Sequence, residues 1–182
     1  MTDRIFSIII VVKRVAEDSY DSAIIFYVLY GESGERRMKI STKGRYALRI
    51  MIDLAVYENG SCVRLKDIAE REGITLKYLE QIMPLLTRAG YVRSFRGNNG
   101  GYMLAKNPEE YTAGEILRAT EGSLSPVACI EDYPNRCVRC GKCPTLSFWE
   151  GMRKLINEYA DGVTLADLAK DYKEKVLTKN KN

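Results

Sequence analysis

The sequence predicts a mainly α-helical fold with a small β wing, and three observations support this class. Apolar residues recur with helical spacing in three segments between residues 41 and 90, separated by short turns that contain glycine. A glycine-rich turn then joins two short runs of strand-forming residues, which predicts a hairpin. A further apolar stripe over residues 146–160 predicts a helix that packs outside a small domain. Together they predict a winged helix-turn-helix domain followed by a long dimerisation helix.

The composition is that of a globular protein, since 46% of the 182 residues are hydrophobic and 29% are charged. Residues 38–106 carry twelve lysine and arginine residues against six acidic ones, whereas the segments on either side each have a net charge of −1. A basic block of this kind predicts a polyanionic partner. The chain has no histidine, so the usual general base and the histidine-assisted nucleophiles are missing. We therefore expect a protein that is not an enzyme.

Residues 1–37 differ in character from the rest of the chain. Their two apolar runs, Ile5–Val12 and Ala23–Tyr30, have eight residues each, whereas a membrane-spanning helix needs about 20. The runs would suit two buried strands. The interpretation that we favour is an upstream extension outside the native protein, because Gly34–Arg37 can be encoded by a purine run that resembles a bacterial ribosome-binding site. Met38 would then be the start of a cytoplasmic protein with no membrane partner.

The first three helices are predicted in order. The first spans Ser41–Tyr57, the second spans Leu65–Glu72 and stops at Gly73, and the third follows Thr75, which can cap it. Pro84 is expected to bend the third helix, because proline removes a backbone hydrogen bond. The residues expected on the buried faces are Tyr46, Ala47, Ile50, Met51, Leu54, Ala55, Leu65, Ile68, Ala69, Leu76, Leu79, Ile82, Met83 and Leu86.

The predicted wing follows the third helix. Tyr91–Phe95 and Tyr102–Leu104 are the expected strands, and the turn between them has Arg93 and Arg96 at its base. A glycine-rich loop flanked by arginines can approach a phosphate backbone closely. Short amphipathic helices beside a hairpin also occur in proteins that do not bind DNA. The basic charge of the block argues against that alternative.

In a helix-turn-helix protein, the outward residues at the start of the third helix face base edges in the major groove. Gln81 could read adenine with two hydrogen bonds, while Lys77 suits a phosphate contact. The predicted partner is therefore a double-stranded DNA operator. The predicted DNA-binding residues are Lys43, Arg45, Tyr46, Thr75, Lys77, Tyr78, Gln81, Arg93, Arg96, Gly97, Asn98 and Asn99.

Four cysteines, Cys129, Cys137, Cys140 and Cys143, lie within fifteen residues, and Cys62 stands apart as an ordinary core or surface residue. Clustered cysteines in a cytosolic chain indicate a metal site rather than disulfides. The final C-x2-C-x2-C-P run is similar to the ligand pattern of iron–sulfur proteins. The spacing of these cysteines is also compatible with a structural zinc site. The four cysteines are thus predicted to hold an iron–sulfur cluster, with zinc as the alternative and a disulfide pair as the third option.

The sequence divides into the extension 1–37, the DNA-binding domain 38–106, a linker helix and cysteine-rich loop over 107–143, and a dimerisation helix with a C-terminal helix over 144–182. The linker helix begins with a capping box, Thr112-x-x-Glu115. The long helix is the predicted dimer interface, because a protein that reads two half-sites needs two-fold symmetry. Core packing is the alternative for its apolar stripe, which comprises Trp149, Met152, Leu155, Ile156 and Tyr159.

Several separated motifs resemble the iron–sulfur cluster regulator (IscR) family of winged-helix repressors. They are Met38–Arg49 (MKISTKGRYALR), Tyr78–Gln81 (YLEQ), Val92–Gly97 (VRSFRG) and Gly100–Tyr102 (GGY). The resemblance extends from Met38 to about Val176, and it supports Met38 as the start. It implies a homodimer in which three cysteines before the dimerisation helix bind a [2Fe-2S] or [4Fe-4S] cluster.

Cys129, Cys137 and Cys143 match the family's triplet best, with seven and five residues between them. One branch of the family takes a histidine as its fourth ligand, and another branch takes an acidic residue. This chain has neither, because Leu146 stands at the position of the histidine and Arg45 at the position of the acidic residue. We hypothesise that Cys140 supplies the fourth thiolate.

The resulting expectation is a repressor that senses iron shortage, oxidants or nitric oxide through its cluster and binds a palindromic operator. One rival is a winged-helix regulator whose cysteines hold zinc or act as a thiol switch. Another is a small iron–sulfur electron-transfer protein, against which the basic wing argues.

Overall fold

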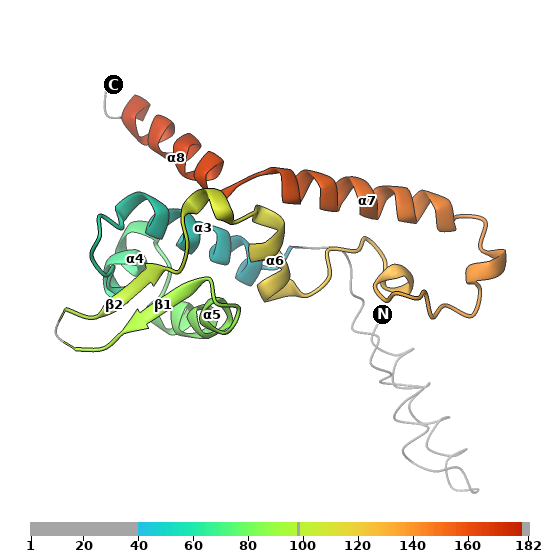
Figure 1. Cartoon of the computed structure of the whole chain (residues 1–182), viewed down its shortest axis with the longest axis horizontal. Coiled ribbons are helices and arrows are strands. Elements are labelled where there is room, and N and C mark those ends of the chain that lie inside the picture. The colour runs from blue at the N-terminus through green and yellow to red at the C-terminus, as the bar shows by residue number, and fades with distance from the viewer. Residues whose placement is uncertain (1–39, 98, 180–182) are drawn as a thin grey trace, which may run out of the picture. The chain divides into compact units, whose positions relative to one another are not determined.

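The computed structural model describes residues 40–97 and 99–179, so the predicted extension 1–37, Met38 and Asn98 lie outside the described residues. The fold is mainly helical with a two-stranded antiparallel sheet, as the sequence predicts (Figure 1). The elements are α3 (Thr42–Tyr57), α4 (Leu65–Glu72), α5 (Leu76–Arg88), β1 (Val92–Phe95), β2 (Gly101–Leu104), η1 (Pro108–Glu110), α6 (Ala113–Glu121), η2 (Ala128–Ile130), η3 (Cys140–Lys142), α7 (Leu146–Gly162) and α8 (Leu165–Lys179).

Helix α3 is the centre of the fold, since it packs against α4, α5, α6, α8 and β2. The predicted stripe on α3 is confirmed, and the completely buried side chains around it come from four other helices. These core residues are Ala47, Ile50, Met51, Leu54, Ile68, Leu79, Ile82, Leu86, Ile116 and Leu165. The prediction is wrong for Leu76, which is 42% exposed. Leu76 is the first residue of α5 and lies between exposed Thr75 and Lys77, beyond the edge of the core.

Two ion pairs join α3 to α4. Arg71 donates two hydrogen bonds of 2.7 Å to the completely buried carboxylate of Asp53, and its guanidinium lies 4.3 Å from the centre of the Tyr57 ring. The hydrogen bond to Asp53 raises the pKa of Arg71. Arg49 similarly binds the nearly buried Glu72 at 2.6 Å. A buried carboxylate is tolerated only when it is paired and hydrogen-bonded, so these contacts fix how the two helices meet.

Two of the predicted helix-end signals have the expected geometry, and a third does not. Gly73 ends α4 with φ of 61°, the left-handed conformation that glycine adopts without strain. Thr112 and Glu115 form the predicted capping box at the start of α6. Thr75 occupies the N-cap position of α5 but its side chain makes no capping hydrogen bond, and α5 continues through Pro84 to Arg88.

The hairpin is attached to the helices through backbone contacts. Val92 pairs with Leu104 and Phe95 with Gly101, and the backbone of Tyr102 also exchanges hydrogen bonds of 2.8 and 2.9 Å with Val63. A Cβ atom at Gly101 would lie 2.5 Å from the carbonyl oxygen of Val63, so this close approach requires glycine.

A buried tyrosine secures the base of the hairpin. The Tyr111 hydroxyl donates to the carbonyl of Tyr91 at 3.0 Å and accepts from the N–H of Lys106 at 2.6 Å. Burial raises the pKa of this hydroxyl. Because Tyr111 lies next to Thr112, the N-cap residue of α6, these bonds connect the wing to that helix.

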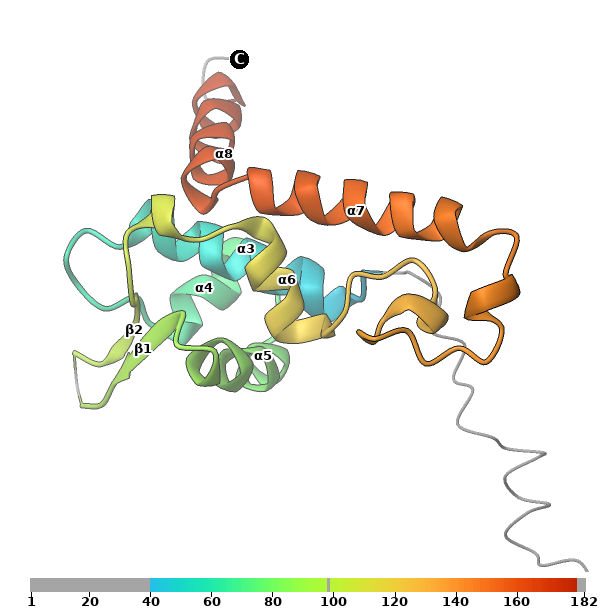
Figure 2. The same ribbon diagram turned by 45° about the vertical axis from the view of Figure 1, so that its right-hand side comes forward.

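Helix α7 packs along α6 and runs beside the segment 122–145, as both views show (Figures 1 and 2). Arg118 of α6 donates to Asn157 at 2.9 Å and also binds Asp161, both on α7. Arg153 of α7 donates to the carbonyl of Ile130 at 2.5 Å, which anchors that segment. Within residues 40–97 and 99–179, no helix is both long and apolar enough to cross a membrane.

The variant Arg71→Met tests the importance of the buried ion pair. It leaves the Asp53 carboxylate buried without its partner, so we expect the free energy of unfolding to fall by about 3–5 kcal/mol in urea denaturation. Arg64→Met is the matched control, because Arg64 and Asp67 form an exposed pair at 3.0 Å and such pairs contribute about 0.2–1 kcal/mol. Equal losses in the two variants would contradict this assignment.

Candidate nucleic-acid interface and cysteine loop

The N-terminal turns of α5 expose the side chains predicted to face DNA bases. Thr75, Lys77 and Gln81 are exposed, and Tyr78 is half-buried. Tyr78 packs edge-on against Tyr46 of α3, with ring centres 5.4 Å apart. The structure therefore brings predicted residues of α3 and α5 together through an aromatic contact, which sets the position of the start of α5 relative to α3.

The first turn of α3 supplies two further predicted residues. Arg45 is exposed and donates to Thr42 at 3.1 Å, and Lys43 is half-buried. Ser41 caps this helix, and its hydroxyl also donates to Glu121 of α6 at 2.6 Å. Glu121 was not predicted from the sequence, because its partner lies 80 residues away.

The predicted wing residues divide into two groups. Arg93 donates to the carbonyl of Ala105 at 3.1 Å and so helps to hold the base of the hairpin. Arg96, Gly97 and Asn99 are exposed at its tip, whereas the predicted contact Asn98 lies outside the described residues. In both views the hairpin and α5 lie on the same side of the helical body, away from α8 (Figures 1 and 2).

Some of the positively charged side chains in residues 38–106 are neutralised by carboxylates of the chain, and others can bind a ligand. Arg49, Arg64 and Arg71 each bind a carboxylate. Lys77 and Arg96 form no ion pair within the described part of the chain. Cations that are not neutralised internally are the ones that can bind phosphate groups. We call α5 together with the β1–β2 hairpin the reading surface.

Residues 122–145, here named the cysteine loop, connect α6 to α7 and carry all four clustered cysteines. Cys129 is exposed on η2, and Cys137, Cys140 and Cys143 are half-buried on and around η3. All four are free thiols. Cys62 is also free and half-buried, and its side chain lies beside Gly101, the residue at which β2 leaves the turn.

Two local contacts shape the loop around Cys137. The N–H of Cys137 donates to Oδ1 of Asn135 at 2.8 Å, and the N–H of Cys140 donates to the carbonyl of Cys137 at 3.0 Å. Asn135 was not predicted from the sequence, although asparagine two residues before a turn residue is a known turn signal. Its other amide atom, Nδ2, is buried and has no hydrogen-bond partner.

The surroundings of Cys143 favour the ionised form of its thiol. Its Sγ lies 3.5 Å from Oγ1 of Thr145, and this hydrogen bond, helped by backbone N–H groups and by the charge of Arg139, lowers the pKa of the thiol. A thiolate is the form that binds metals and reacts with electrophiles. This contact of Thr145 was not predicted from the sequence, since a threonine near a helix start usually acts as a cap.

The donor atoms of the cysteine loop have the chemical character that a soft metal or an iron–sulfur cluster needs, because they are thiols on one short, accessible segment. Among the residues that the structure describes, however, no three cysteine or carboxylate side chains are close enough to share a metal ion. The other ligand positions of the resemblance offer no substitute, since Leu146 starts α7 and Arg45 lies on α3.

An apolar cleft of about 480 Å³ lies between α3, α6, α7 and α8. It is lined by Leu48, Leu117, Leu155, Ile156 and Tyr159, among others. Leu155 and Tyr159 are 68% and 78% exposed. Part of the predicted α7 stripe is therefore solvent-facing, so core packing does not account for the whole of it.

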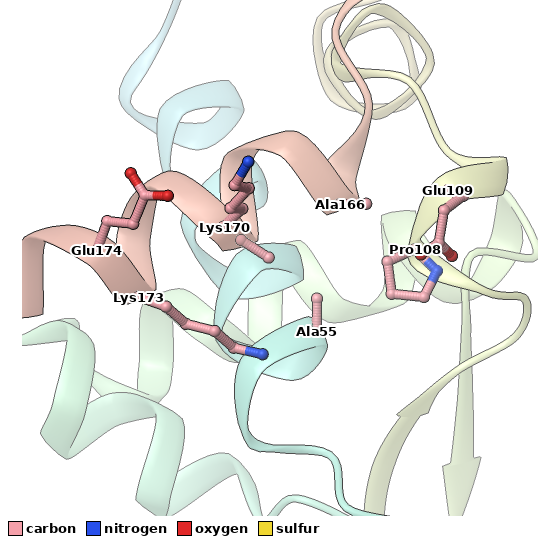
Figure 3. A pocket seen from close by; sticks show the side chains of 8 residues that line it. Ala55, Pro108, Glu109, Ala166, Lys170, Lys173 and Glu174 are labelled. Carbon is pink, nitrogen blue, oxygen red and sulfur yellow. The ribbon is translucent and has the colours of Figure 1, made fainter. Parts of the chain in front are cut away.

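A second hollow, of about 310 Å³, lies between α3, η1 and α8 (Figure 3). Its lining includes Ala55, Glu109, Lys170 and Lys173. None of the residues predicted to bind DNA or metal lies in it.

Comparison with known proteins decides the family. The model of the Rrf2 family, described as an iron-dependent transcriptional regulator, matches residues 40–171. The chain belongs to the Rrf2 family. The predicted relationship to IscR-type regulators is thereby confirmed, and so is the expectation of a protein that is not an enzyme, because the relatives of this Rrf2-family chain are transcriptional regulators.

Three relatives illustrate the similarity. The protein Rrf2 of Nitratidesulfovibrio vulgaris is 39% identical over 134 residues, which are 74% of this chain and 89% of that protein. The regulator CymR of Bacillus subtilis is 42% identical over 132 residues, which are 72% of this chain and 90% of CymR. The solved structure of T. potens IscR has 41% identity and a TM-score of 0.60, and covers 75% of this chain and 90% of its own.

Proposed function

We propose that this Rrf2-family regulator is a cytoplasmic homodimer that represses transcription from a palindromic operator and carries an iron–sulfur cluster in its cysteine loop. The observation that carries the proposal is the position of the loop between α6, which packs on the DNA-binding core, and α7, whose apolar face is exposed. A change in the loop can therefore act on both the reading surface and the dimer. We assign the sequence regions 38–106, 107–143 and 144–182 to DNA binding, sensing and dimerisation.

Operator binding is supported by the unneutralised cations of the reading surface. Lys77 and Arg96 stand at the start of α5 and at the wing tip, where a winged helix contacts the major groove and the adjacent phosphates. Gln81 lies one helical turn after Lys77 and is exposed, so it can reach a base edge.

Dimerisation is supported by the exposed stripe of α7. Leu155 and Tyr159 are one turn apart and border the apolar cleft, which a second copy of the chain would cover. Two-fold symmetry would place two reading surfaces on the two half-sites of a palindrome.

The cluster assignment is supported by four free thiols with cationic neighbours, Arg136, Arg139 and Lys142. When bound, a cluster would supply a redox-sensitive group whose loss or oxidation changes the loop. Cys129, Cys137, Cys140 and Cys143 would hold it, with Cys140 in the place of the missing fourth ligand. A cluster that favours one conformation by a few kcal/mol would shift the population of states substantially.

A second candidate is a thiol switch without a cluster. It is favoured by the separation of the thiols in the described residues and by the lowered pKa of the Cys143 thiol. A zinc site with the same four ligands belongs to the same rival class. Metal analysis separates these alternatives from the cluster.

Anaerobic purification tests the cluster proposal. We expect near-stoichiometric iron and sulfide per chain with visible absorption at about 400 nm, and we expect Cys140→Ser to lose most of both. Cys62→Ser is the matched control and is expected to retain iron and sulfide. A colourless wild-type protein that carries zinc, or no metal, would rule out the cluster and leave the DNA-binding proposal intact.

Two substitutions on α5 separate phosphate contacts from base contacts. We expect Lys77→Ala to weaken binding to all sequences similarly and to reduce the slope of log K against log salt by about 1. We expect Gln81→Ala to reduce discrimination at one base pair by about 1–3 kcal/mol with little change in that slope. Fluorescence anisotropy with operator and scrambled duplexes at several salt concentrations measures both. If both variants bound the operator and scrambled duplexes as the wild-type protein does, α5 would be excluded from the DNA interface.

The oligomeric state tests the role of α7. Leu155→Glu places a charge in the exposed apolar stripe, and we expect it to convert the dimer into a monomer in sedimentation analysis. Lys154→Glu introduces the same residue at the neighbouring exposed position and is expected to remain dimeric. A dimeric Leu155→Glu protein would place the interface elsewhere.

A further inference from the structure

We propose that Glu121 is a positioning residue for DNA binding. Its carboxylate, on the last residue of α6, holds the N-cap residue of α3 and so directs Lys43 and Arg45 toward phosphate groups of the duplex. The inference rests on the DNA binding of the proposed function, but it requires no metal or cluster in the cysteine loop. Three observations lead to it.

The first observation is that the Glu121 carboxylate binds Ser41 at two points. The Ser41 hydroxyl donates to Oε1 at 2.6 Å, and the Ser41 N–H donates to Oε2 at 3.4 Å. The same hydroxyl oxygen accepts from the N–H groups of Lys43 at 3.1 Å and Gly44 at 3.4 Å. A hydroxyl group has one proton and two lone pairs. The acceptor on α6 therefore takes the proton and leaves both lone pairs to cap α3.

The second observation is that α3 leaves room for this carboxylate. A Cβ atom at the buried residue Gly44 would lie 2.5 Å from Oε1 of Glu121, and the next two atoms that it would meet also belong to the Glu121 side chain. Glycine destabilises a helix relative to alanine. Contact with Glu121 thus gives a reason for the missing side chain at position 44.

The third observation is that the first turns of α3 lie beside the reading surface. Tyr46 packs edge-on against Tyr78 at the start of α5, with ring centres 5.4 Å apart. Lys43 and Arg45 come just before Tyr46, and neither forms an ion pair within the part of the chain that the structure describes. Lysine, arginine and helix N-termini are the groups that contact DNA phosphates. The turn that Glu121 holds therefore carries two unneutralised cations next to α5.

The effect of removing Glu121 separates positioning from simple charge. A carboxylate that only adds negative charge near the interface repels DNA, so its removal would strengthen binding. A carboxylate that positions two cations is needed for their contacts, so its removal would weaken binding. The two roles predict changes of opposite sign.

The test uses the full chain and a DNA duplex of mixed sequence, with fluorescence anisotropy at several salt concentrations. Glu121→Ala removes the acceptor of the Ser41 hydroxyl, whereas Glu121→Gln removes the charge and keeps an oxygen acceptor. Gly44→Ala keeps every charged group and displaces the carboxylate. Glu109→Ala is the control for net charge, because Glu109 is an exposed carboxylate on η1. Thermal melting followed by circular dichroism establishes that each variant is folded.

We expect Glu121→Ala to bind the duplex more weakly and to reduce the slope of log K against log salt by about 1–2, since each lost phosphate contact removes about 0.9. Gly44→Ala is expected to change both quantities in the same direction, although alanine favours the helix. Glu121→Gln and Glu109→Ala are expected to bind at least as tightly as the wild type. In a protein that already carries Lys43→Ala and Arg45→Ala, Glu121→Ala is expected to cause no further loss.

Unchanged or tighter binding by folded Glu121→Ala would overturn the inference, and so would a further loss in the protein that lacks both cations. If Glu121→Ala does not fold, Gly44→Ala decides, and wild-type binding by that variant would overturn the inference. These results would leave the proposed function standing, because Lys77 and Arg96 remain to bind DNA. A wild-type protein that does not bind the duplex at low salt would overturn both.

Discussion

The buried carboxylate of Asp53 imposes the constraint on which the DNA-binding half of the molecule depends. It lies in the middle of α3, completely excluded from solvent, and Arg71 of α4 satisfies it with two hydrogen bonds of 2.7 Å. Because both bonds must be kept, α4 can meet α3 in only a narrow range of orientations. Gly73 then turns the chain immediately into α5. The direction in which α5 presents Lys77 and Gln81 thus depends on this ion pair, on the second pair between Arg49 and Glu72, and on the ring contact of Tyr78 with Tyr46.

The connection from the reading surface to the cysteine loop is made of similar polar contacts. Tyr111 joins the hairpin to the start of α6, and Glu121 at the end of α6 accepts from the N-cap residue of α3. Arg118 joins α6 to α7, and Arg153 of α7 holds the loop at Ile130. The first two contacts link α6 to the hairpin and to α3, and the last two link α7 to α6 and to the cysteine loop. A chain of polar contacts therefore connects the loop to α3 and to the hairpin.

Much of the fold could be predicted because its signals are local. Helical periodicity, the stop at Gly73 and the capping box at Thr112 depend on residues within one or two turns of each other, and the structure has all three. The failure is tertiary, because the spacing of Leu76 fits the buried face but α5 begins beyond the edge of the core. The hydrogen bond from Arg93 to the carbonyl of Ala105 likewise depends on the pairing of the hairpin, which spacing alone does not reveal.

The candidate metal site, like the fold, could be predicted only in part from the sequence. The identity of the candidate ligands could be predicted, because thiols are recognisable wherever they lie. Their environment could not. Arg153 reaches the loop from 23 residues away, and Asn135 and Thr145, although each lies two residues from the cysteine it contacts, are polar residues of kinds that have many other uses in loops and helix caps. The cysteine loop also lacks regular periodicity, so its sequence contains no indication of which side chains converge.

The central claim is that the state of the cysteine loop controls the affinity of the reading surface for DNA. The most direct test is an anaerobic titration of one operator duplex with the same protein in its cluster-loaded and metal-stripped forms, at one salt concentration. The account predicts dissociation constants that differ by tenfold or more, about 1.4 kcal/mol, and a difference that disappears on a scrambled duplex. Equal dissociation constants for the two forms would contradict it.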